Sequence, residues 1–178
     1  SLANDIDLSE ESNWQPIENF SGYFNGNGFS IKNLTINAVN AENVGLFATV
    51  SGTVENLKIE NAQITARGDA GKAGIIAGTN KGKISNVSVS GSITPQYYGY
   101  VGGIVGYSDL GKITNCTNTA TVTGADNVGG IAGYVLVNTD NAVTSCINEG
   151  VIEGKNNVGG IAGYVTCVTS NATYQISN

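Results

Sequence analysis

Apolar and polar residues alternate in short stretches along this chain. IKNLTI (31–36), VENLKI (54–59) and ISNVSV (84–89) each place Val, Ile or Leu at every second or third position, with Asn, Lys, Ser or Thr between them. Shorter stretches with the same alternation follow, namely QIT (63–65), SIT (92–94) and TVT (121–123). A period of two in sequences rich in Val, Ile and Thr predicts β-strands, and no stretch shows the apolar stripe of a helix.

The strands belong to a repeat. NVGGIAGYV occurs twice without change, at 127–135 and 157–165, and related stretches begin at Val44, Ala73 and Val101. The five copies start 29, 28, 27 and 30 residues apart, which is a period typical of stacked repeat proteins. Clusters of Gly, Asn and Asp between the strands supply the backbone conformations of tight corners.

These features predict an all-β fold, a parallel β-solenoid of about five to six coils with three short strands in each coil of about 28 residues. We expect one module over residues 1–178, and a fragment of a longer protein. The expected coils are approximately 1–43, 44–72, 73–100, 101–127, 128–157 and an incomplete 158–178.

Stacking would turn equivalent positions into columns. Leu57, Val87, Cys116 and Cys146 fall in one column, with Leu34 before and Ile176 after, and their apolar character predicts that it is interior. The preceding column contains Asn33, Asn56, Asn86 and Asn115, continued by Ser145 and Gln175, and predicts a ladder of side-chain amides at a corner. The facing of the VGGIAGY segment stays open, because its Val and Ile are three apart.

Composition excludes several functions. The net charge is −6 and the pI about 4.4, whereas nucleic-acid binding needs a basic stripe, and no apolar run is long enough for membrane insertion. Of three cysteines, Cys116 and Cys146 stack in the expected core, where we expect small hydrophobic side chains rather than a disulfide.

Catalytic chemistry is not expected. The chain has no His, which excludes Ser-His-Asp and Cys-His catalysis and any His-built metal site. The 14 acidic residues are scattered over single corner positions and form no columns of neighbouring acids. We therefore predict no enzyme activity, no cofactor and no metal.

Together, VGGIAGY, the IxNC phrase and an opening containing LANDIDLS, NWQPI and FSGYFNGNGFSIKNLTI resemble the GLUG-motif repeat family of bacterial surface proteins. The resemblance covers nearly the whole chain; AGIIAGTN (73–80) and the final TYQISN (173–178) depart from it. It implies a right-handed β-solenoid on a cell surface, in adhesin-like proteins or as a non-catalytic N-terminal module of bacterial immunoglobulin A proteases.

Three functions remain open. The first is an adhesin-like extracellular module that displays a rigid surface to a host protein or glycan. The second is a glycan-binding solenoid, or a substrate-positioning module of a secreted protease; Tyr107, Tyr134 and Tyr164 would form its column, with Tyr97, Tyr98 and Tyr100 nearby. The third is binding of ice or ordered water by the threonines beside Ile64, Ile93 and Val122. These threonines extend over only three successive coils, which is too few to favour this function.

One short motif suggests a partner. Arg67, Gly68 and Asp69 form the tripeptide that integrins recognise, between QIT and AGIIAG, where we expect an exposed corner. Gly with charged residues is also ordinary corner chemistry, and the other copies lack the tripeptide.

Overall fold

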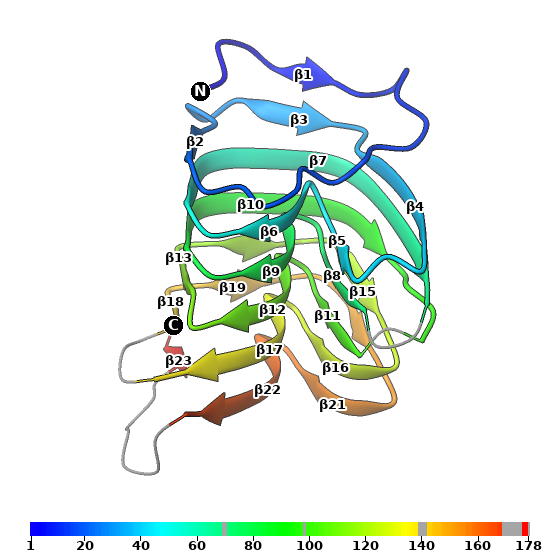
Figure 1. The fold of residues 1–178 in the computed structure, drawn as a ribbon, viewed down its shortest axis with the longest axis vertical. Coiled ribbons are helices and arrows are strands. Elements are labelled where there is room, and N and C mark those ends of the chain that lie inside the picture. Colours follow the sequence, from blue (N-terminus) through cyan, green and yellow to red (C-terminus); the bar gives the residue numbers. More distant parts are fainter. Residues whose placement is uncertain (69–70, 98, 139–141, 169–175, 178) are drawn as a thin grey trace.

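The chain forms a stack of parallel coils (Figure 1). The computed structural model describes residues 1–68, 71–97, 99–138, 142–168 and 176–177, and every regular element in them is a β-strand. All strand pairs between the described residues are parallel and join one coil to the next. The predicted all-β parallel solenoid is therefore confirmed.

Three sheets form the walls of the solenoid. A 13-stranded sheet, called the long sheet below, is made of β1 (Ile6–Asp7), β2 (Tyr23–Asn25), β3 (Ser30–Lys32), β4 (Thr35–Val39), β7 (Thr53–Arg67), β10 (Lys83–Ile93), β13 (Lys112–Thr114), β14 (Thr117–Asn118), β15 (Thr121–Thr123), β18 (Val143–Thr144), β19 (Ile147–Asn148), β20 (Ile152–Glu153) and β23 (Ile176–Ser177). The first short sheet contains β5 (Asn43–Val44), β8 (Lys72–Gly74), β11 (Tyr100–Gly102), β16 (Asp126–Gly129) and β21 (Asn156–Gly159). The second short sheet contains β6 (Phe47–Val50), β9 (Ala77–Asn80), β12 (Val105–Asp109), β17 (Ala132–Val137) and β22 (Ala162–Cys167). Each coil visits the first short sheet, the second and then the long sheet, which gives about five turns.

The long strands bend around corners without leaving the sheet. In β7 the side chains of Val54, Leu57, Ile59 and Ile64 are buried, whereas most of the residues between them face outward. Asn56 adopts a positive φ of 54°, which turns the chain at little cost because Asn tolerates this conformation better than other side chains do. One strand can therefore follow the curve of the core.

The glycine pair of the VGGIAGY motif makes the corner between the two short sheets. Val101 and Ile104 lie on either side of the pair and both are fully buried, because the chain changes direction between them. A Cβ on Gly103 would overlap the carbonyl oxygen of Gly130 in the next coil and would lie 2.5 Å from Cγ of Asn118. The open question of how this segment faces is thus answered by a bend that lets both apolar residues point inward.

The N-terminal residues cover one end of the stack (Figure 1). β1 pairs with β3, and β3 pairs with β7, so residues 1–43 supply two layers on the long sheet rather than the single coil expected from the sequence. The Trp14 Nε1–H donates to the carbonyl of Leu46 at 3.1 Å, and the ring of Phe20 lies 4.9 Å from that of Phe47. Bulky side chains therefore close the core at this end.

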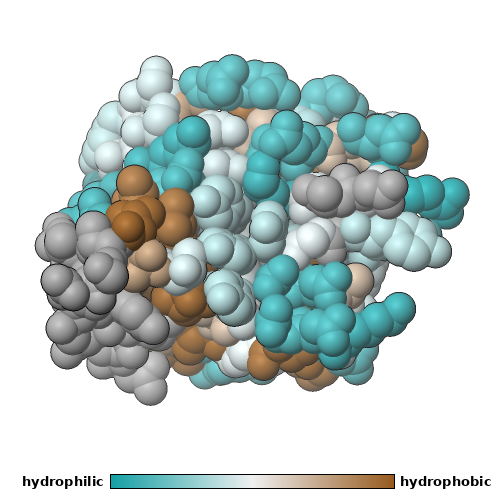
Figure 2. All heavy atoms as spheres, turned by 60° about the horizontal axis from the view of Figure 1, so that its bottom comes forward, coloured by the Kyte–Doolittle hydropathy of each residue, from teal (hydrophilic) through white to brown (hydrophobic). Residues whose placement is uncertain are grey.

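The opposite end looks different. Figure 2 shows hydrophobic atoms at the surface of this end, beside polar residues. Among the described residues of the last two coils, Ile147, Val151, Val158 and Val168 have exposed fractions of 46–58%. Val128, the partner of Val158 in the preceding coil, is fully buried.

Candidate functional site

The predicted interior column lies in the core. Leu57 and Val87 are direct partners on β7 and β10, and Leu57, Val87, Cys116 and Cys146 have exposed fractions of only 0–2%. The flanking pair Ser88–Thr117 places Cys116 in line with Val87. These side chains are packing residues and offer no chemistry to the surface.

The prediction is wrong at the two ends of that column. Leu34 lies one corner further along its coil, because its neighbour Thr35 pairs with Gln63 and not with Lys58. Ile176 pairs with Val143, so it does not continue the column beyond Cys146. Both segments resemble the repeat phrase by letter but occupy a different place in the coil.

The asparagine ladder exists over most of its predicted length. The Asn86 amide donates to Asn56 Oδ1 at 3.1 Å, and the Asn115 amide donates to Asn86 Oδ1 at 3.3 Å. Ser145 takes the next place, with a φ of 52° against 54° for Asn115, whereas Gln175 lies outside the described residues. The ladder holds a corner in shape and uses its donors and acceptors internally.

The predicted place of Asn33 in this ladder is wrong. It accepts a hydrogen bond from the Asn61 amide at 2.8 Å and donates to Asp7 Oδ1 at 2.8 Å, which places it at the second corner of the long sheet. The place before Asn56 belongs to Asn25, whose Oδ1 accepts from the Asn56 amide at 3.2 Å. Both corners use Asn with positive φ, so the two ladders look alike in sequence.

The cysteines are free thiols. A hydrogen bond with the Cys146 thiol, together with burial, raises the pKa of the Cys116 thiol. Cys116 therefore stays protonated at neutral pH and unreactive as a nucleophile. Cys167, near the open end, is only half-buried.

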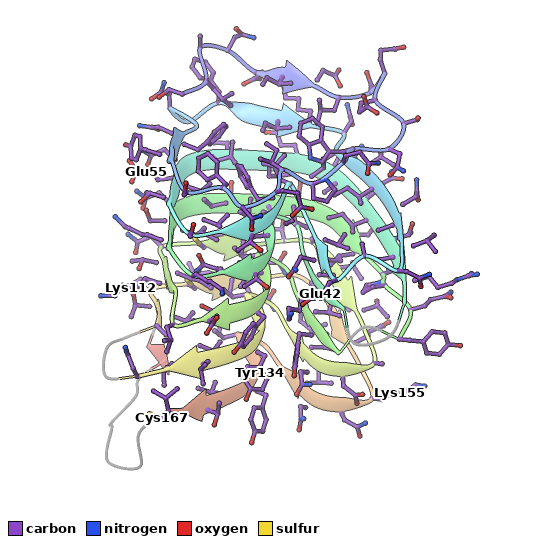
Figure 3. All side chains as sticks on the ribbon, viewed as in Figure 1. Glu42, Glu55, Lys112, Tyr134, Lys155 and Cys167 are labelled. Atoms are coloured by element: carbon purple, nitrogen blue, oxygen red, sulfur yellow. The ribbon has the colours of Figure 1, made fainter. Side chains whose placement is uncertain are left out.

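The predicted tyrosine column forms on the outside of the second short sheet, and Figure 3 marks its middle member, Tyr134. Tyr107 pairs with Tyr134 and Tyr134 with Tyr164, with ring centroids 5.3 and 5.2 Å apart. Tyr100, from the first short sheet, packs 5.7 Å from Tyr107 and 5.0 Å from Tyr134. In the preceding coil the same position is Thr79, so the aromatic column begins at Tyr107.

The column is partly shielded and lies beside an ion pair. The Lys72 Nζ lies 6.0 Å from the centroid of the Tyr107 ring and 2.6 Å from Glu42 Oε1. Burial, followed by the charge of Asp109, raises the pKa of Tyr107. Tyr164 at the end of the column is 45% exposed, so the accessible aromatic surface lies there.

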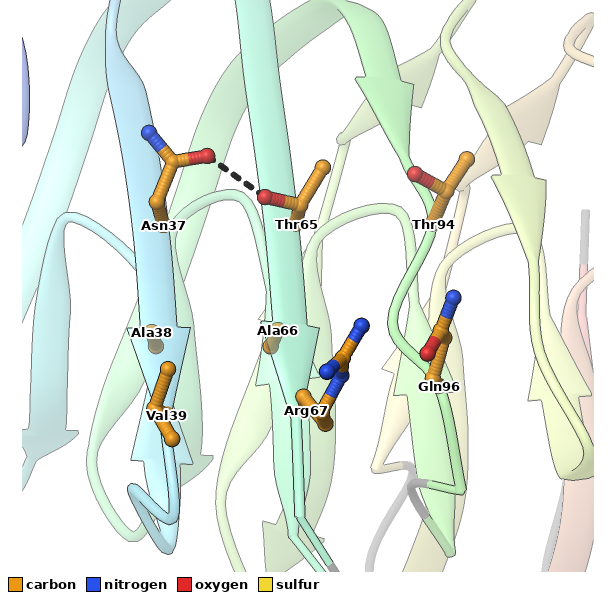
Figure 4. A pocket seen from close by; sticks show the side chains of 8 residues that line it. All are labelled: Asn37, Ala38, Val39, Thr65, Ala66, Arg67, Thr94 and Gln96. Carbon is orange, nitrogen blue, oxygen red and sulfur yellow. Dashed lines mark hydrogen bonds between the residues drawn. The ribbon is translucent and has the colours of Figure 1, made fainter.

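A groove runs along the solenoid axis where the long sheet ends. Its first part has a volume of about 300 Å³. Figure 4 shows Asn37, Thr65 and Thr94 in one row across adjacent coils, and Val39, Arg67 and Gln96 in a second row. The Thr65 hydroxyl donates to Asn37 Oδ1 at 2.6 Å.

A second part of about 300 Å³ continues the groove toward later coils, and both parts share Gln96. Tyr97, Thr123 and Lys155 line it, and Tyr97 is 69% exposed. Tyr97 also has a φ of 67°, a conformation in which bulky side chains are strained. The sequence predicts Tyr97 near the column of Tyr107, but the structure places it in this groove. We define the two parts together as the axial groove.

The tripeptide at 67–69 is only partly described. Arg67 is the last residue of β7, and its carbonyl accepts the Asn40 N–H at 2.7 Å. Gly68 has a φ of 154° and lies against the backbone of Asn40. Asp69, like Tyr98, lies outside the described residues, so recognition of the tripeptide by an integrin stays a prediction.

The described part of the chain contains no group of three or more His, Cys, Asp or Glu side chains that could hold a metal ion. It also contains no helix that is long and apolar enough to cross a membrane.

Known proteins share the repeat and the fold. The family model of the GLUG motif matches residues 97–123. Halomucin of Haloquadratum walsbyi is 34% identical over 139 residues, which cover 68% of this chain and 2% of halomucin. A protein of Evansella cellulosilytica described as a candidate Gly-rich membrane protein is 36% identical over 99 residues, covering 49% of this chain and 12% of that protein.

A solved structure matches almost the whole chain. The crystal structure of a candidate immunoglobulin A1 protease from Bacteroides ovatus superposes with a TM-score of 0.77 at 25% identity, covering 99% of this chain and 59% of the other. This chain thus spans a small part of the curated relatives and more than half of the solved one. The chain therefore carries a GLUG motif at residues 97–123, and its repeats form a solenoid similar to that of the Bacteroides ovatus protein.

Proposed function

We propose that this chain is a non-catalytic, adhesin-like module on the outside of a cell, where it presents a rigid surface for binding to host or matrix. The observation that carries the proposal is the uninterrupted stack of coils, in which apolar side chains fill the interior and polar side chains face outward. On β7, for example, Lys58, Glu60, Gln63 and Thr65 are exposed. Such a wall offers repeated polar contacts with little loss of conformational freedom on binding.

The relatives support the surface location. One is named halomucin and another a Gly-rich membrane protein, and this chain matches only 2% and 12% of their lengths. A solenoid that forms a small part of a long protein can act as a spacer that carries binding surfaces away from an anchor. We extend this arrangement to the parent protein of this chain.

The non-catalytic assignment rests on the chain's own residues. The sequence has no His, and the described carboxylates form no metal-binding cluster. The Bacteroides ovatus protein is described as a protease, yet 41% of its chain lies outside the match, since the match covers 59%. In that setting the solenoid would position a substrate for a catalytic part elsewhere in the protein.

The test uses beads coated with the purified chain and surfaces coated with host mucin, extracellular-matrix proteins or albumin. We expect retention under flow on mucin or matrix and none on albumin. Beads carrying Val87→Asp, which should not fold, are the matched control. Equal retention of both proteins on every surface contradicts adhesion, and cleavage of immunoglobulin A1 by the purified chain contradicts a non-catalytic role.

A second candidate is glycan binding on the tyrosine column, favoured by the stacked rings that end at the exposed Tyr164. Aromatic faces pack against the apolar faces of sugars. Tyr164→Thr should reduce retention on mucin while the melting temperature stays unchanged, because Thr occupies the same column at Thr79. Unchanged retention would show that the tyrosine column does not bind the glycans of mucin.

A further inference from the structure

We infer that the axial groove binds an acidic polysaccharide, with a sugar ring on Tyr97 and sugar carboxylates on Arg67 and Lys155. The inference rests on the proposed surface role, for which it names the class of ligand and the place where the ligand binds. The groove lies on the outer face of the long sheet at its end, whereas the column of Leu57 and Val87 on the same sheet points into the core.

Two cations define the charge of the ligand. Arg67 lines the first part of the groove and Lys155 the second, in a chain of net charge −6 that has 8 Lys and Arg residues in all. Within the described residues neither forms an ion pair, whereas Lys32, Lys72 and Lys81 do. The guanidinium of Arg presents parallel donors that match a carboxylate.

The carboxylate of Glu153 limits where the acid groups can lie. Glu153 pairs with Thr123, so it stands at the end of the hydroxyl row near Lys155. Repulsion from Glu153 weakens a carboxylate contact at Lys155, so the contact at Arg67 is the stronger of the two. Because the chain as a whole is acidic, binding depends on local contacts with these cations and not on long-range attraction.

The walls of the groove suit sugar hydroxyls. Asn37, Thr65, Thr94 and Gln96 all carry groups that donate and accept hydrogen bonds, and their rungs repeat at about 4.8 Å along the axis. An extended polymer with hydroxyls at regular intervals can lie along such a row. A peptide strand would gain no backbone pairing here, because the groove lies on the face of the sheet and not on an open edge.

Tyr97 supplies the aromatic surface. The backbone hydrogen bond from the Gln96 N–H to the Ala66 carbonyl, 2.7 Å long, fixes the chain immediately before it. The ring is 69% exposed although the φ of 67° strains a bulky side chain. Strain that places an aromatic ring at the lip of a polar groove is typical of a ligand contact.

The experiment is isothermal titration of the folded chain with hexamers of galacturonic acid, and with hexamers of galactose as the neutral counterpart. We expect the acidic hexamer to bind and the neutral one to bind more weakly. Arg67→Gln should weaken binding of the acidic hexamer about tenfold, because it removes a charge-assisted hydrogen bond, and should leave the neutral hexamer unaffected.

Tyr97→Gly separates ligand binding from folding. Gly adopts a positive φ without strain, so this variant should melt at or above the temperature of the parent and yet lose binding of both hexamers. Lys83→Gln, an exposed cation at the start of β10, is the matched control and should bind as the parent does.

Three results would overturn the inference: equal affinity for the two hexamers, equal loss in Arg67→Gln and Lys83→Gln, or undiminished binding by Tyr97→Gly. Tighter binding of a sulfated hexamer than of the uronate would also overturn the carboxylate assignment. Loss of binding in Tyr164→Thr but not in Tyr97→Gly would move the site to the tyrosine column. None of these results touches the proposed surface role, which the mucin and matrix retention assay tests by itself.

Discussion

The two identical copies of NVGGIAGYV provide a matched pair of substitutions. Gly130 and Gly160 occupy the same place in the motif, but only Gly130 has a described coil on both sides. A Cβ on Gly130 would overlap the Gly160 carbonyl oxygen and lie 2.5 Å from Oδ1 of Asn148. A Cβ on Gly160 would meet no described atom within 4 Å.

The contact at Gly130 cannot be relieved cheaply. Asn148 Oδ1 accepts a hydrogen bond from the Asn118 amide at 2.8 Å, and its own amide donates to Gly150 at 3.1 Å. Moving the side chain strains or breaks these bonds, each worth about 1 kcal/mol, in addition to an overpacking cost of about 1–3 kcal/mol. Ala restricts the unfolded chain more than Gly does, and this restriction offsets about 0.4–1 kcal/mol of the loss in stability.

We therefore expect Gly130→Ala to lower the free energy of unfolding by about 2–4.5 kcal/mol. For a chain of this size, that corresponds to a fall of about 4–18 °C in melting temperature. Gly160→Ala should leave stability unchanged or raise it by up to about 1 kcal/mol. Thermal and urea unfolding followed by circular dichroism measure both, and equal effects of the two substitutions would refute the stacking of the motif on itself.

Three further predictions concern other parts of the stack. Val87→Asp should prevent folding, because a buried carboxylate without a partner costs several kcal/mol; an unchanged melting curve would place the side chain outside. Thiol titration of the folded chain should label Cys167 well before Cys116, whose thiol pKa is raised by its hydrogen-bonded neighbour and by burial, and simultaneous labelling would contradict this. The backbone N–H of Ser30, followed by the side chain of Lys32, lowers the pKa of Asp5 below its ordinary value of 3.8. The ionised carboxylate therefore stabilises the folded chain above pH 3.8, and this stabilisation is lost as the pH falls through the pKa of the folded state. Trp14 fluorescence should report this acid transition, and Asp5→Asn should weaken it; the same profile in both proteins would exclude the contact.

Repetition made most of the fold predictable. Five spaced copies of one phrase fixed the coil length, and the alternation within VENLKI and ISNVSV fixed which side chains point inward, as the burial of Leu57 and Val87 shows. The N-terminal layers were harder, because IKNLTI reads like VENLKI. In the structure IKNLTI pairs with residues 59–64, which follow the corner at Asn56, so Asn33 bonds to Asn61 and not to Asn56. A local phrase cannot tell two corners apart when both use Asn in the same backbone conformation.

The candidate sites were predictable only in part. Equal spacing indicated the column of Tyr107, Tyr134 and Tyr164, but Tyr100 joins it from another sheet, and no periodicity in the sequence signals that contact. The axial groove escaped sequence analysis because it depends on the outward turn of Tyr97, which is set by a positive φ unusual for Tyr.

The central claim is that successive repeats stack in register, and nuclear Overhauser effects between tyrosine rings test it most directly. With ring centroids 5.3 and 5.2 Å apart, Tyr134 should show cross-peaks to both Tyr107 and Tyr164. Tyr107 and Tyr164 are two coils apart and should show none to each other. Absence of both Tyr134 cross-peaks, in a chain that retains its β-sheet circular dichroism, would contradict the stacked register and the columns and groove that depend on it.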